Sequence, residues 1–286
     1  MTGYLFLAPF LMGLTIFVII PIFYTIFLSF VDYNSLGTIG NFKFVGFQNY
    51  MEVLQDKGMV SSYFKSIKYS LVYVPSMIVF SLLMASIMNK RFYFRTASRT
   101  MIFMPYVANV TAVAIVFNVL LNPYDGPVNA LLKFIGIKNP PNWLMDSNLA
   151  LPVTALVATW ANLAFQTIVF LAALQEVPEE LYEATEIEGA NAWQKFTRIT
   201  LPWISPTTFF LVVTTIIGST QNFSGIYTLT QGGPGDATEV AIISIYHSGF
   251  QFNKYSIASA QSMILFAALL IITIIQWRGQ KKWVNY

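Results

Sequence analysis

Acidic side chains are concentrated in one short segment of this 286-residue chain, EVPEELYEATEIEGA at residues 176–190. The segment holds six of the thirteen acidic residues of the protein: Glu176, Glu179, Glu180, Glu183, Glu186 and Glu188. Pro178 suits a first helical position, and the two glutamates after it then lie at the positive end of the helix dipole. Glu183, Glu186 and Glu188 approach the C-terminal end of the helix, where the dipole disfavours negative charge. Three pairs are like-charge neighbours at helical spacing: Glu176–Glu180, Glu179–Glu183 and Glu180–Glu183. The pattern predicts a short acidic helix that is unstable in isolation.

A second short helix is expected directly after the acidic one. Gly189 provides a break of the kind that follows a helix end. Residues 192–200 then form a helix with one apolar stripe, and Pro202 stops it. The result is a helix–glycine–helix hairpin within residues 175–205, too polar for a bilayer and too short for a domain. Its apolar side chains therefore need a partner.

Uncharged polar side chains form a second candidate site. They gather in two apolar segments, with Thr159, Trp160, Asn162 and Gln166 in one, and Thr214, Thr215, Ser219, Thr220, Gln221, Asn222 and Ser224 in the other. Helical spacing puts Asn162 and Gln166 on one face, and Thr215, Ser219 and Asn222 on another. Amides, hydroxyls and aromatic rings suit sugar hydroxyls and pyranose faces, which favours a carbohydrate site. Packing between membrane helices uses the same residue types and is an equal alternative.

Other reactive groups are scarce. The chain has no cysteine and only one histidine, His247, which excludes disulfides, thiolate metal sites and histidine-based metal or triad sites. No Gly-x-x-x-x-Gly-Lys-Ser/Thr motif occurs, so the chain cannot bind nucleotide phosphates in a P-loop. A net charge of +3 without a basic tract does not indicate nucleic acid as a partner.

Long uncharged segments must position these residues. With 56% hydrophobic and 10% charged residues, the composition is that of a membrane protein. Six windows of about 20 apolar residues, the length that a bilayer requires, lie at 4–31, 69–89, 101–121, 149–174, 206–228 and 256–277. Each is expected to be one spanning helix, which predicts an all-α fold. The first is too long for a cleaved signal peptide, so we expect it to be retained.

The absence of ionisable residues from all six windows bears on two rival functions. A proton-coupled secondary carrier places such residues within the membrane, although sodium coupling stays open. A membrane-embedded enzyme needs a general acid or base at that depth. The sequence therefore favours neither rival.

Basic residues are densest at 90–99 and 278–286, and four predicted spans separate these clusters. Lysine and arginine mark the cytoplasmic side, so the N-terminus, the C-terminus and residues 175–205 are expected there. The outward-facing connections are then residues 32–65, 122–148 and 229–255. Four lysines on or near the outer side are exceptions to the rule: Lys43, Lys57, Lys65 and Lys68.

The hairpin resembles the EAA loop of bacterial ABC importer permeases. The resemblance rests on Glu183, Ala184, Gly189, Ala190, Phe196, Ile199, Leu201 and Pro202. Thr185 departs from the pattern, since the loop's name would have a second alanine there. The opening GYLFLAPFLMGLTIFVIIPIFYTIFLSF, the following GFQNY and the later TQGGPGDAT are similar to the carbohydrate-uptake branch, specifically its MalF/UgpA-like subunit.

This resemblance implies a type I importer (MetI-like) bundle of six helices in the bacterial cell membrane, without catalytic activity of its own. It implies a first helix and outer loop at 1–65, a five-helix core at 66–277 and a basic cytoplasmic tail at 278–286. Glu183 is expected to contact a basic residue of an ATPase subunit. No cofactor is expected in this chain, because ATP and magnesium bind to that ATPase.

The implied partners are a second, MalG-like permease of six helices, two ATPase copies, an external sugar-binding protein and membrane lipid. The expected substrate is a sugar, and an oligosaccharide in particular. Aligned through the loop, five residues fall at or beside sugar-contacting positions of the maltose-type permease: Asn162, Phe165, Thr215, Ser219 and Asn222. The side chains mostly differ there, which leaves the identity of the sugar open. Further candidates for lining the passage are Pro105, Tyr106 and Asn109, with a tolerated proline kink as the alternative.

Overall fold

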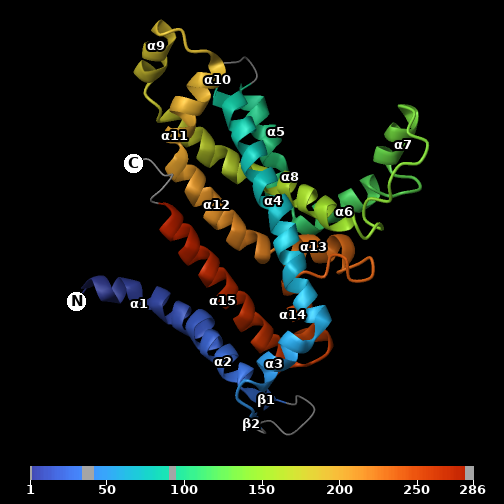
Figure 1. Ribbon diagram of the computed structural model, residues 1–286. Coiled ribbons are helices and arrows are strands. Elements are labelled where there is room, and N and C mark those ends of the chain that lie inside the picture. The colour runs from blue at the N-terminus through green and yellow to red at the C-terminus, as the bar shows by residue number, and fades with distance from the viewer. Residues whose placement is uncertain (1, 34–41, 90–94, 281–286) are drawn as a thin grey trace. The chain divides into compact units, whose positions relative to one another are not determined.

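The computed structural model describes residues 2–33, 42–89 and 95–280 (Figure 1). Both basic clusters that set the predicted orientation are only partly covered. Residues 90–94 of the first cluster and residues 281–286 of the second lie outside the described residues. The cytoplasmic placement of the two termini therefore stays a prediction.

The chain divides into two compact units, each described below by itself. The first unit comprises Met1–Phe64 and Val240–Leu270, and the second comprises Lys65–Glu239 and Ile271–Tyr286. The division expected from the resemblance, at residues 1–65, 66–277 and 278–286, stays a prediction.

The first unit begins with an uninterrupted helical run. Three consecutive elements form it: α1 (Thr2–Leu14), the π-helical turn η1 (Thr15–Ile19) and α2 (Ile20–Ser29). The stretch Phe6–Ser29 has no charged residue and is long and apolar enough to cross a membrane. Most of its apolar side chains are exposed, as lipid-facing side chains must be. The first predicted span is confirmed.

A small antiparallel sheet follows α2. Its strands are β1 (Val31–Tyr33) and β2 (Phe42–Phe44), and they lead into helix α3 (Gln48–Gln55). The buried Asn49 side chain donates hydrogen bonds to the carbonyl oxygens of Ser29 and Val31, both at 2.9 Å, and so fastens α3 to the strand. The predicted all-α fold class is confirmed, since the described chain is mostly helical. The sequence did not indicate this small sheet because strands of three residues are too short to give a periodic pattern.

The second segment of the first unit holds α14 (Ala241–Tyr246), the π-helical turn η3 (His247–Gln251) and the start of α15 (Tyr255–Gln280). Ile257 and Ala260 of α15 pack on Val53 of α3. The Tyr63 hydroxyl, near the start of α4 (Lys57–Asn89), donates to the carbonyl oxygen of Gln261 at 2.9 Å. These contacts join α3, α4 and α15 within the unit.

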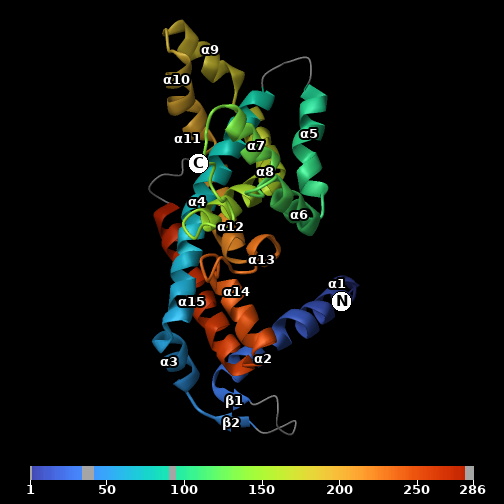
Figure 2. The same cartoon turned by 90° about the vertical axis from the view of Figure 1, so that its right-hand side faces the viewer.

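The second unit is organised around α8 (Ala150–Gln175), many of whose alanine, leucine and threonine side chains are buried. The most extensive contacts of α8 within the described chain are with α5 (Arg95–Val107), α6 (Val110–Leu120), α12 (Ser205–Thr220) and α13 (Phe223–Thr230), which Figures 1 and 2 show. The remainder of α4 and the short α7 (Pro127–Phe134) complete this part of the unit. Small residues on α8 allow its neighbours to approach closely.

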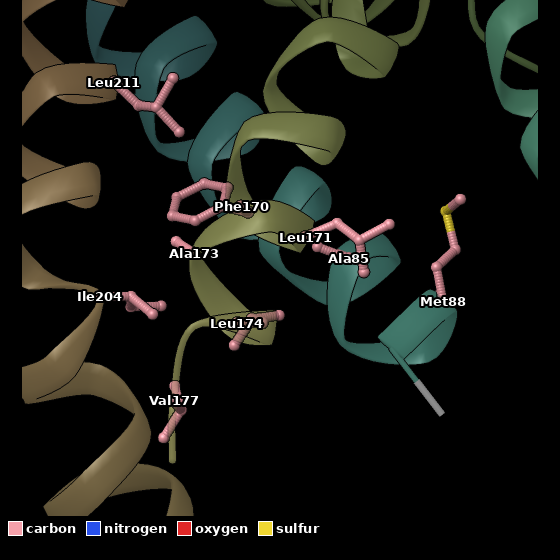
Figure 3. Packing of buried hydrophobic residues seen from close by; sticks show 9 residues of the cluster. All are labelled: Ala85, Met88, Phe170, Leu171, Ala173, Leu174, Val177, Ile204 and Leu211. Atoms are coloured by element: carbon pink, nitrogen blue, oxygen red, sulfur yellow. The ribbon is translucent and has the colours of Figure 1, made fainter. Parts of the chain in front are cut away.

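The main apolar cluster of the second unit joins three helices at one end of α8 (Figure 3). Ala85 and Met88 come from α4, Phe170, Leu171, Ala173 and Leu174 from α8, Val177 from just after it, and Ile204 and Leu211 from the α12 region. Phe170 and Ile204 are fully buried. Tight packing of this kind makes the ends of the three helices move together.

Four single helices of the described chain are long and apolar enough to cross a membrane: Phe6–Ser29, Lys57–Asn89, Ala150–Gln175 and Tyr255–Gln280. A fifth candidate is a bent pair, in which Ala192–Trp203 and Ser205–Thr220 meet at an angle of 68°. The predicted number of six continuous spanning helices is therefore not confirmed by length and composition. The two remaining predicted spans are not single continuous helices, because the helix is interrupted within each of them.

Two breaks interrupt predicted spans, and an asparagine lies at each. The window at 101–121 ends its first helix at Val107, and the Asn109 side chain caps the next one by accepting the Thr111 backbone N–H at 2.8 Å. The window at 206–228 breaks after Thr220, where Asn222 caps α13 by accepting from the Gly225 backbone at 3.3 Å. Asparagine competes for backbone hydrogen bonds, which is why an uncharged run need not be one helix.

Candidate coupling hairpin and polar pathway

The acidic segment forms the predicted helix. α9 (Glu179–Ile187) begins directly after Pro178, so the proline occupies the capping position rather than the first helical position. Glu179 and Glu180 lie in its first turn, where the helix dipole favours negative charge. We call residues 178–203 the glutamate hairpin.

Gly189 makes the turn between the two arms of the glutamate hairpin. Its φ of +77° lies in the left-handed region, which glycine adopts without steric cost. The Gly189 N–H donates to the Glu186 carbonyl at 3.0 Å, and the Ala190 N–H donates to the Thr185 carbonyl at 3.0 Å. This pair of bonds is the Schellman arrangement that closes a helix C-terminus. The predicted break at Gly189 is confirmed.

The second arm begins with a capping box. The Asn191 side chain accepts from the Gln194 backbone N–H, the Gln194 side chain accepts from the Asn191 N–H, and both distances are 2.9 Å. The arm then runs through three consecutive elements: α10 (Ala192–Lys195), the π-helical turn η2 (Phe196–Thr200) and α11 (Leu201–Trp203).

The prediction that Pro202 stops the second arm is wrong. The arm continues to Trp203, and the 68° bend into α12 follows at Ile204. A proline inside an α-helix clashes with the carbonyl one turn earlier. Here the preceding turn is wider, since the Leu201 N–H bonds to the Phe196 carbonyl five residues back, and the π-helical turn accommodates the proline ring.

Two side-chain contacts join the arms. The Tyr182 and Thr200 hydroxyl oxygens lie 2.9 Å apart and share a hydrogen bond. The Lys195 ammonium lies 2.8 Å from the Glu186 carboxylate, and its hydrogen bond lowers the pKa of Glu186. Sequence reasoning did not identify these contacts, although opposite charges on the two arms were a visible signal. Both contacts lie within the hairpin itself.

The tip of the hairpin displays acidic and apolar side chains together. Glu183 and Ala184 are exposed on α9, and Ile187 and Trp193 are 89% and 70% exposed. Phe196 is half-buried, with its ring centroid 6.0 Å from that of Trp193. Large exposed apolar groups beside charges are typical of a surface that binds a protein.

The base of the hairpin belongs to the main apolar cluster of the second unit. Tyr182, Ile199 and Leu201 pack against the buried residues from α4, α8 and the α12 region. The base of the hairpin is therefore in direct contact with the ends of these helices. Both views in Figures 1 and 2 show α9 and α10 projecting beyond the end of α8.

The second candidate site is not one continuous lining. Gln166 and Thr215 are brought together across α8 and α12, where the Gln166 amide nitrogen donates to the Thr215 hydroxyl at 2.6 Å. Gln166 is 8% exposed, and its Oε1 atom has no hydrogen-bond partner among the described residues. A buried acceptor without a donor is costly, which distinguishes this residue from ordinary helix packing.

Asn162 and Asn222 line a shared cavity between α6, α8 and α13. Its volume of about 20 Å³ is far below the roughly 300 Å³ at which small-molecule sites begin. The Asn162 amide donates to the Ala158 carbonyl at 2.8 Å within its own helix. The cavity has no room for a sugar in this conformation.

Ser219 and Asn222 contact α4. The Ser219 hydroxyl lies 2.6 Å from that of Ser70, and the Asn222 amide donates to the Tyr69 hydroxyl at 2.7 Å. Because α12 ends before Asn222, this residue does not continue the face of Thr215 and Ser219 as predicted. Sequence reasoning missed Ser70 and Tyr69, since nothing local indicates a contact between segments so distant in the chain.

Phe165 lies apart from the other pathway residues. Its side chain is exposed, and its ring stacks on that of Tyr106 with centroids 6.5 Å apart. The structure thus places the predicted pathway residues in three groups rather than one. Within the described chain, no group of three or more histidine, aspartate or glutamate residues could hold a metal ion.

Comparisons with known proteins agree with this architecture. Residues 77–278 match the family described as "Binding-protein-dependent transport system inner membrane component". The UgpA protein of Agrobacterium fabrum, an sn-glycerol-3-phosphate transport system permease, is 31% identical and the match covers 99% of this chain and 96% of that protein. The MalF protein of Thermococcus litoralis, a trehalose/maltose transport system permease, is 31% identical, with 96% and 91% covered.

A solved structure has the same fold. It is the crystal structure of a bacterial alginate ABC transporter in complex with an alginate pentasaccharide-bound periplasmic protein. One of its chains superposes with a TM-score of 0.84 at 25% identity, covering 98% of this chain and 94% of that chain. The region that matches the family, residues 77–278, includes the glutamate hairpin and all the predicted pathway residues. This chain belongs to the family of inner membrane components of binding-protein-dependent transport systems.

Proposed function

We propose that this chain is one permease subunit of an ATP-driven, binding-protein-dependent sugar importer and forms half of the translocation pathway. The observation that carries the proposal is the glutamate hairpin, a preformed element with an exposed tip and a base packed into the membrane helices. The relatives named above support a sugar or sugar derivative as substrate. The alginate transporter supports an oligosaccharide in particular.

The hairpin would couple this chain to an ATPase subunit. Glu183 would pair with a basic residue of the ATPase, and Ile187 and Trp193 would enter an apolar part of its surface. Closure of two ATPase copies would then move the tip, and the buried base would pass this movement to α4, α8 and α12. ATP and magnesium would bind to the ATPase, with no cofactor in this chain.

The substrate would pass along the polar groups of α8, α12 and α13. Since the cavity beside Asn162 and Asn222 holds only about 20 Å³, the helices must separate before a sugar fits there. Separation would free Asn222 from Tyr69, and Gln166 would offer its unpaired Oε1 to a sugar hydroxyl. The alternative role of these residues is packing between helices, and their hydrogen bonds to one another in this conformation favour that role.

The partners follow from this role. A second permease subunit of the same family would complete the pathway, and an external sugar-binding protein would deliver the substrate to the outward-facing loops. Both termini and the glutamate hairpin would lie in the cytoplasm, with lipid around the exposed apolar helices. The inner membrane is the location given by the family description.

A test of this function measures uptake in cells of the source organism. Deletion of the gene should abolish uptake of one radiolabelled sugar among a panel, and the intact gene should restore it. Uptake should fail when ATP is depleted and persist when the proton gradient alone is collapsed. Transport by the purified chain alone in liposomes without ATP would overturn the proposal and establish a secondary carrier.

A further inference from the structure

A polar cavity in the second unit lies where two apolar helices begin. Its volume is about 360 Å³, which lies within the range of roughly 300–1,000 Å³ for small-molecule sites. The lining comes from α4, from the first turn of α8 with the residues before it, and from the loop after α13. The cavity shares no residue with the glutamate hairpin or with the polar pathway.

One wall of the cavity is an ion pair. The Lys65 ammonium lies 2.5 Å from the Asp236 carboxylate and 2.6 Å from the Asp236 carbonyl oxygen. The Lys65 side chain is 15% exposed and the Asp236 side chain 67% exposed, so the lysine is the buried member of the pair. The hydrogen bond from Lys65 lowers the pKa of Asp236, which therefore stays ionised and cancels the charge of Lys65 at neutral pH.

Lys68 supplies the one charge of the cavity lining that no described neighbouring residue compensates. It lies one turn further along α4 with an exposed side chain, and within the described chain it makes no hydrogen bond or ion pair. Lys65, Lys68 and Asp236 are the charged residues of the lining, so its net charge is one positive. Ser147 and Asn148 add a hydroxyl and an amide, both neutral donors.

One acidic residue that is adjacent in sequence to the lining makes its hydrogen bond elsewhere. Asp146 precedes these two residues but does not line the cavity, and its Oδ1 atom accepts the Asn148 backbone N–H at 2.7 Å. The lining therefore favours an anion over a cation.

The cavity also lies at the boundary of apolar surface. Lys68 is the last charged residue before the uncharged run at 69–89, and Asp146 is the last before the uncharged run at 147–175. Leu151 and Pro152 give one apolar wall. A ligand with an anionic group and an apolar part fits such a boundary.

We propose that this cavity binds a phosphate-type oxyanion, with Lys68 as its charged contact and Ser147 and Asn148 as neutral donors. Two sources can supply that group at a membrane boundary, the head group of a phospholipid and a soluble phosphorylated compound. The site gives Lys65 and Lys68 a function on the side of the membrane where few lysines are expected. It is independent of the transport function proposed above.

The test compares the full-length chain in mild detergent with two variants. Lys68→Gln removes the charge, and Lys57→Gln is the matched control because Lys57 is an exposed lysine at the start of the same helix, outside the cavity. Native mass spectrometry measures retained phosphatidylglycerol, with diacylglycerol as the lipid that lacks the phosphate. Calorimetric titration measures the Kd for inorganic phosphate.

We expect Lys68→Gln to weaken binding about fivefold, because one lysine near an anionic group contributes a binding free energy of that size. Lys57→Gln should leave binding unchanged. Loss of phosphatidylglycerol without a phosphate response would identify a lipid head group, and the reverse would identify a soluble ligand. Equal binding of both probes by the two variants would overturn the proposal. Ser147→Ala should also weaken binding, whereas Ser61→Ala, outside the cavity, should not. This second pair of variants tests the proposal if Lys68→Gln does not fold.

Discussion

The hydroxyl oxygens of Tyr182 and Thr200 lie 2.9 Å apart and join the two arms of the glutamate hairpin. Tyr182 belongs to the acidic helix, and Thr200 to the arm that leads into α12. Tyr182 packs against the apolar cluster at the ends of α4 and α8, and Thr200 is buried. The bond therefore connects the exposed tip of the hairpin to the membrane helices that it would have to move.

Tyr182→Phe tests this link. The substitution keeps the ring in the cluster and removes one hydrogen bond, which is worth about 1 kcal/mol. We expect trypsin to cut the hairpin after Lys195 and Arg198 about fivefold faster, since local opening becomes that much more frequent. Tyr124→Phe is the control, because Tyr124 is 80% exposed and lies outside the hairpin. Equal cleavage rates in the two variants would show that the bond does not hold the arms.

Two glycine-to-alanine substitutions should change the stability of the protein in opposite directions. Gly189→Ala forces a side chain into the left-handed region, at a cost of about 1–2 kcal/mol, although no atom lies within 4 Å of the new carbon. Gly218→Ala lies in ordinary helical backbone with equally open space, and there alanine gains about 0.5–1 kcal/mol. Denaturant unfolding in detergent, with tryptic cleavage of the hairpin, measures both. Destabilisation by both variants, or by neither, would contradict the backbone conformation at Gly189 as the cause of the difference.

The ion pair between Glu186 and Lys195 should make the hairpin sensitive to pH. The pKa of Glu186 is lowered in the folded protein, so its contribution is complete above the pKa of an unfolded glutamate and disappears as the pH falls through the lowered value. The effect is small because the carboxylate is exposed. Hydrogen–deuterium exchange of residues 191–195 should differ between wild type and Glu186→Gln at neutral pH and converge in acid.

Glu188→Gln provides the reference for that experiment. It removes the same charge from the same arm without breaking the contact to Lys195. A difference between wild type and Glu186→Gln that persists in acid, or an equal effect of Glu188→Gln, would contradict the ion-pair explanation.

Asn222→Ala separates a substrate contact from helix packing. If Asn222 binds sugar, the variant should reduce sugar-stimulated ATPase activity of the assembled transporter by about tenfold and leave basal activity nearly unchanged, in line with one lost polar contact of about 1.4 kcal/mol. Tyr69→Phe is the matched variant, because it removes the same hydrogen bond and keeps the amide. Equal losses of basal and stimulated activity in both variants would assign Asn222 to packing.

Composition and hydropathy were sufficient to predict the long helices. The uncharged runs of α8 and α15 agree with the structure to within a few residues at each end, because a bilayer demands length and apolarity above all. Hydropathy could not reveal the breaks before Asn109 and Asn222, since a capping asparagine leaves a window apolar. The result is a correct fold class with an unconfirmed number of spanning helices.

The hairpin was predictable because its signals are local. Gly189 and the like-charged glutamates predict the turn and the acidic arm from sequence alone, and the family resemblance implies the role proposed for them. The failure at Pro202 came from the π-helical turn before it, which no propensity scale indicates. The contacts of Ser219 and Asn222 with α4 depend on packing between segments that are distant in the chain. The sequence could therefore predict the pathway residues but not their spatial arrangement.

The most direct test of the central claim is an affinity purification of this chain from its native membrane, with mass spectrometry of the proteins that accompany it. Wild type should recover a P-loop ATPase and a second permease of the same family. Glu183→Lys should lose the ATPase, whereas Glu52→Lys, the same charge change on α3 outside the hairpin, should retain it. Recovery of the ATPase at equal yield with Glu183→Lys, or of this chain alone from wild type, would contradict coupling through the glutamate hairpin.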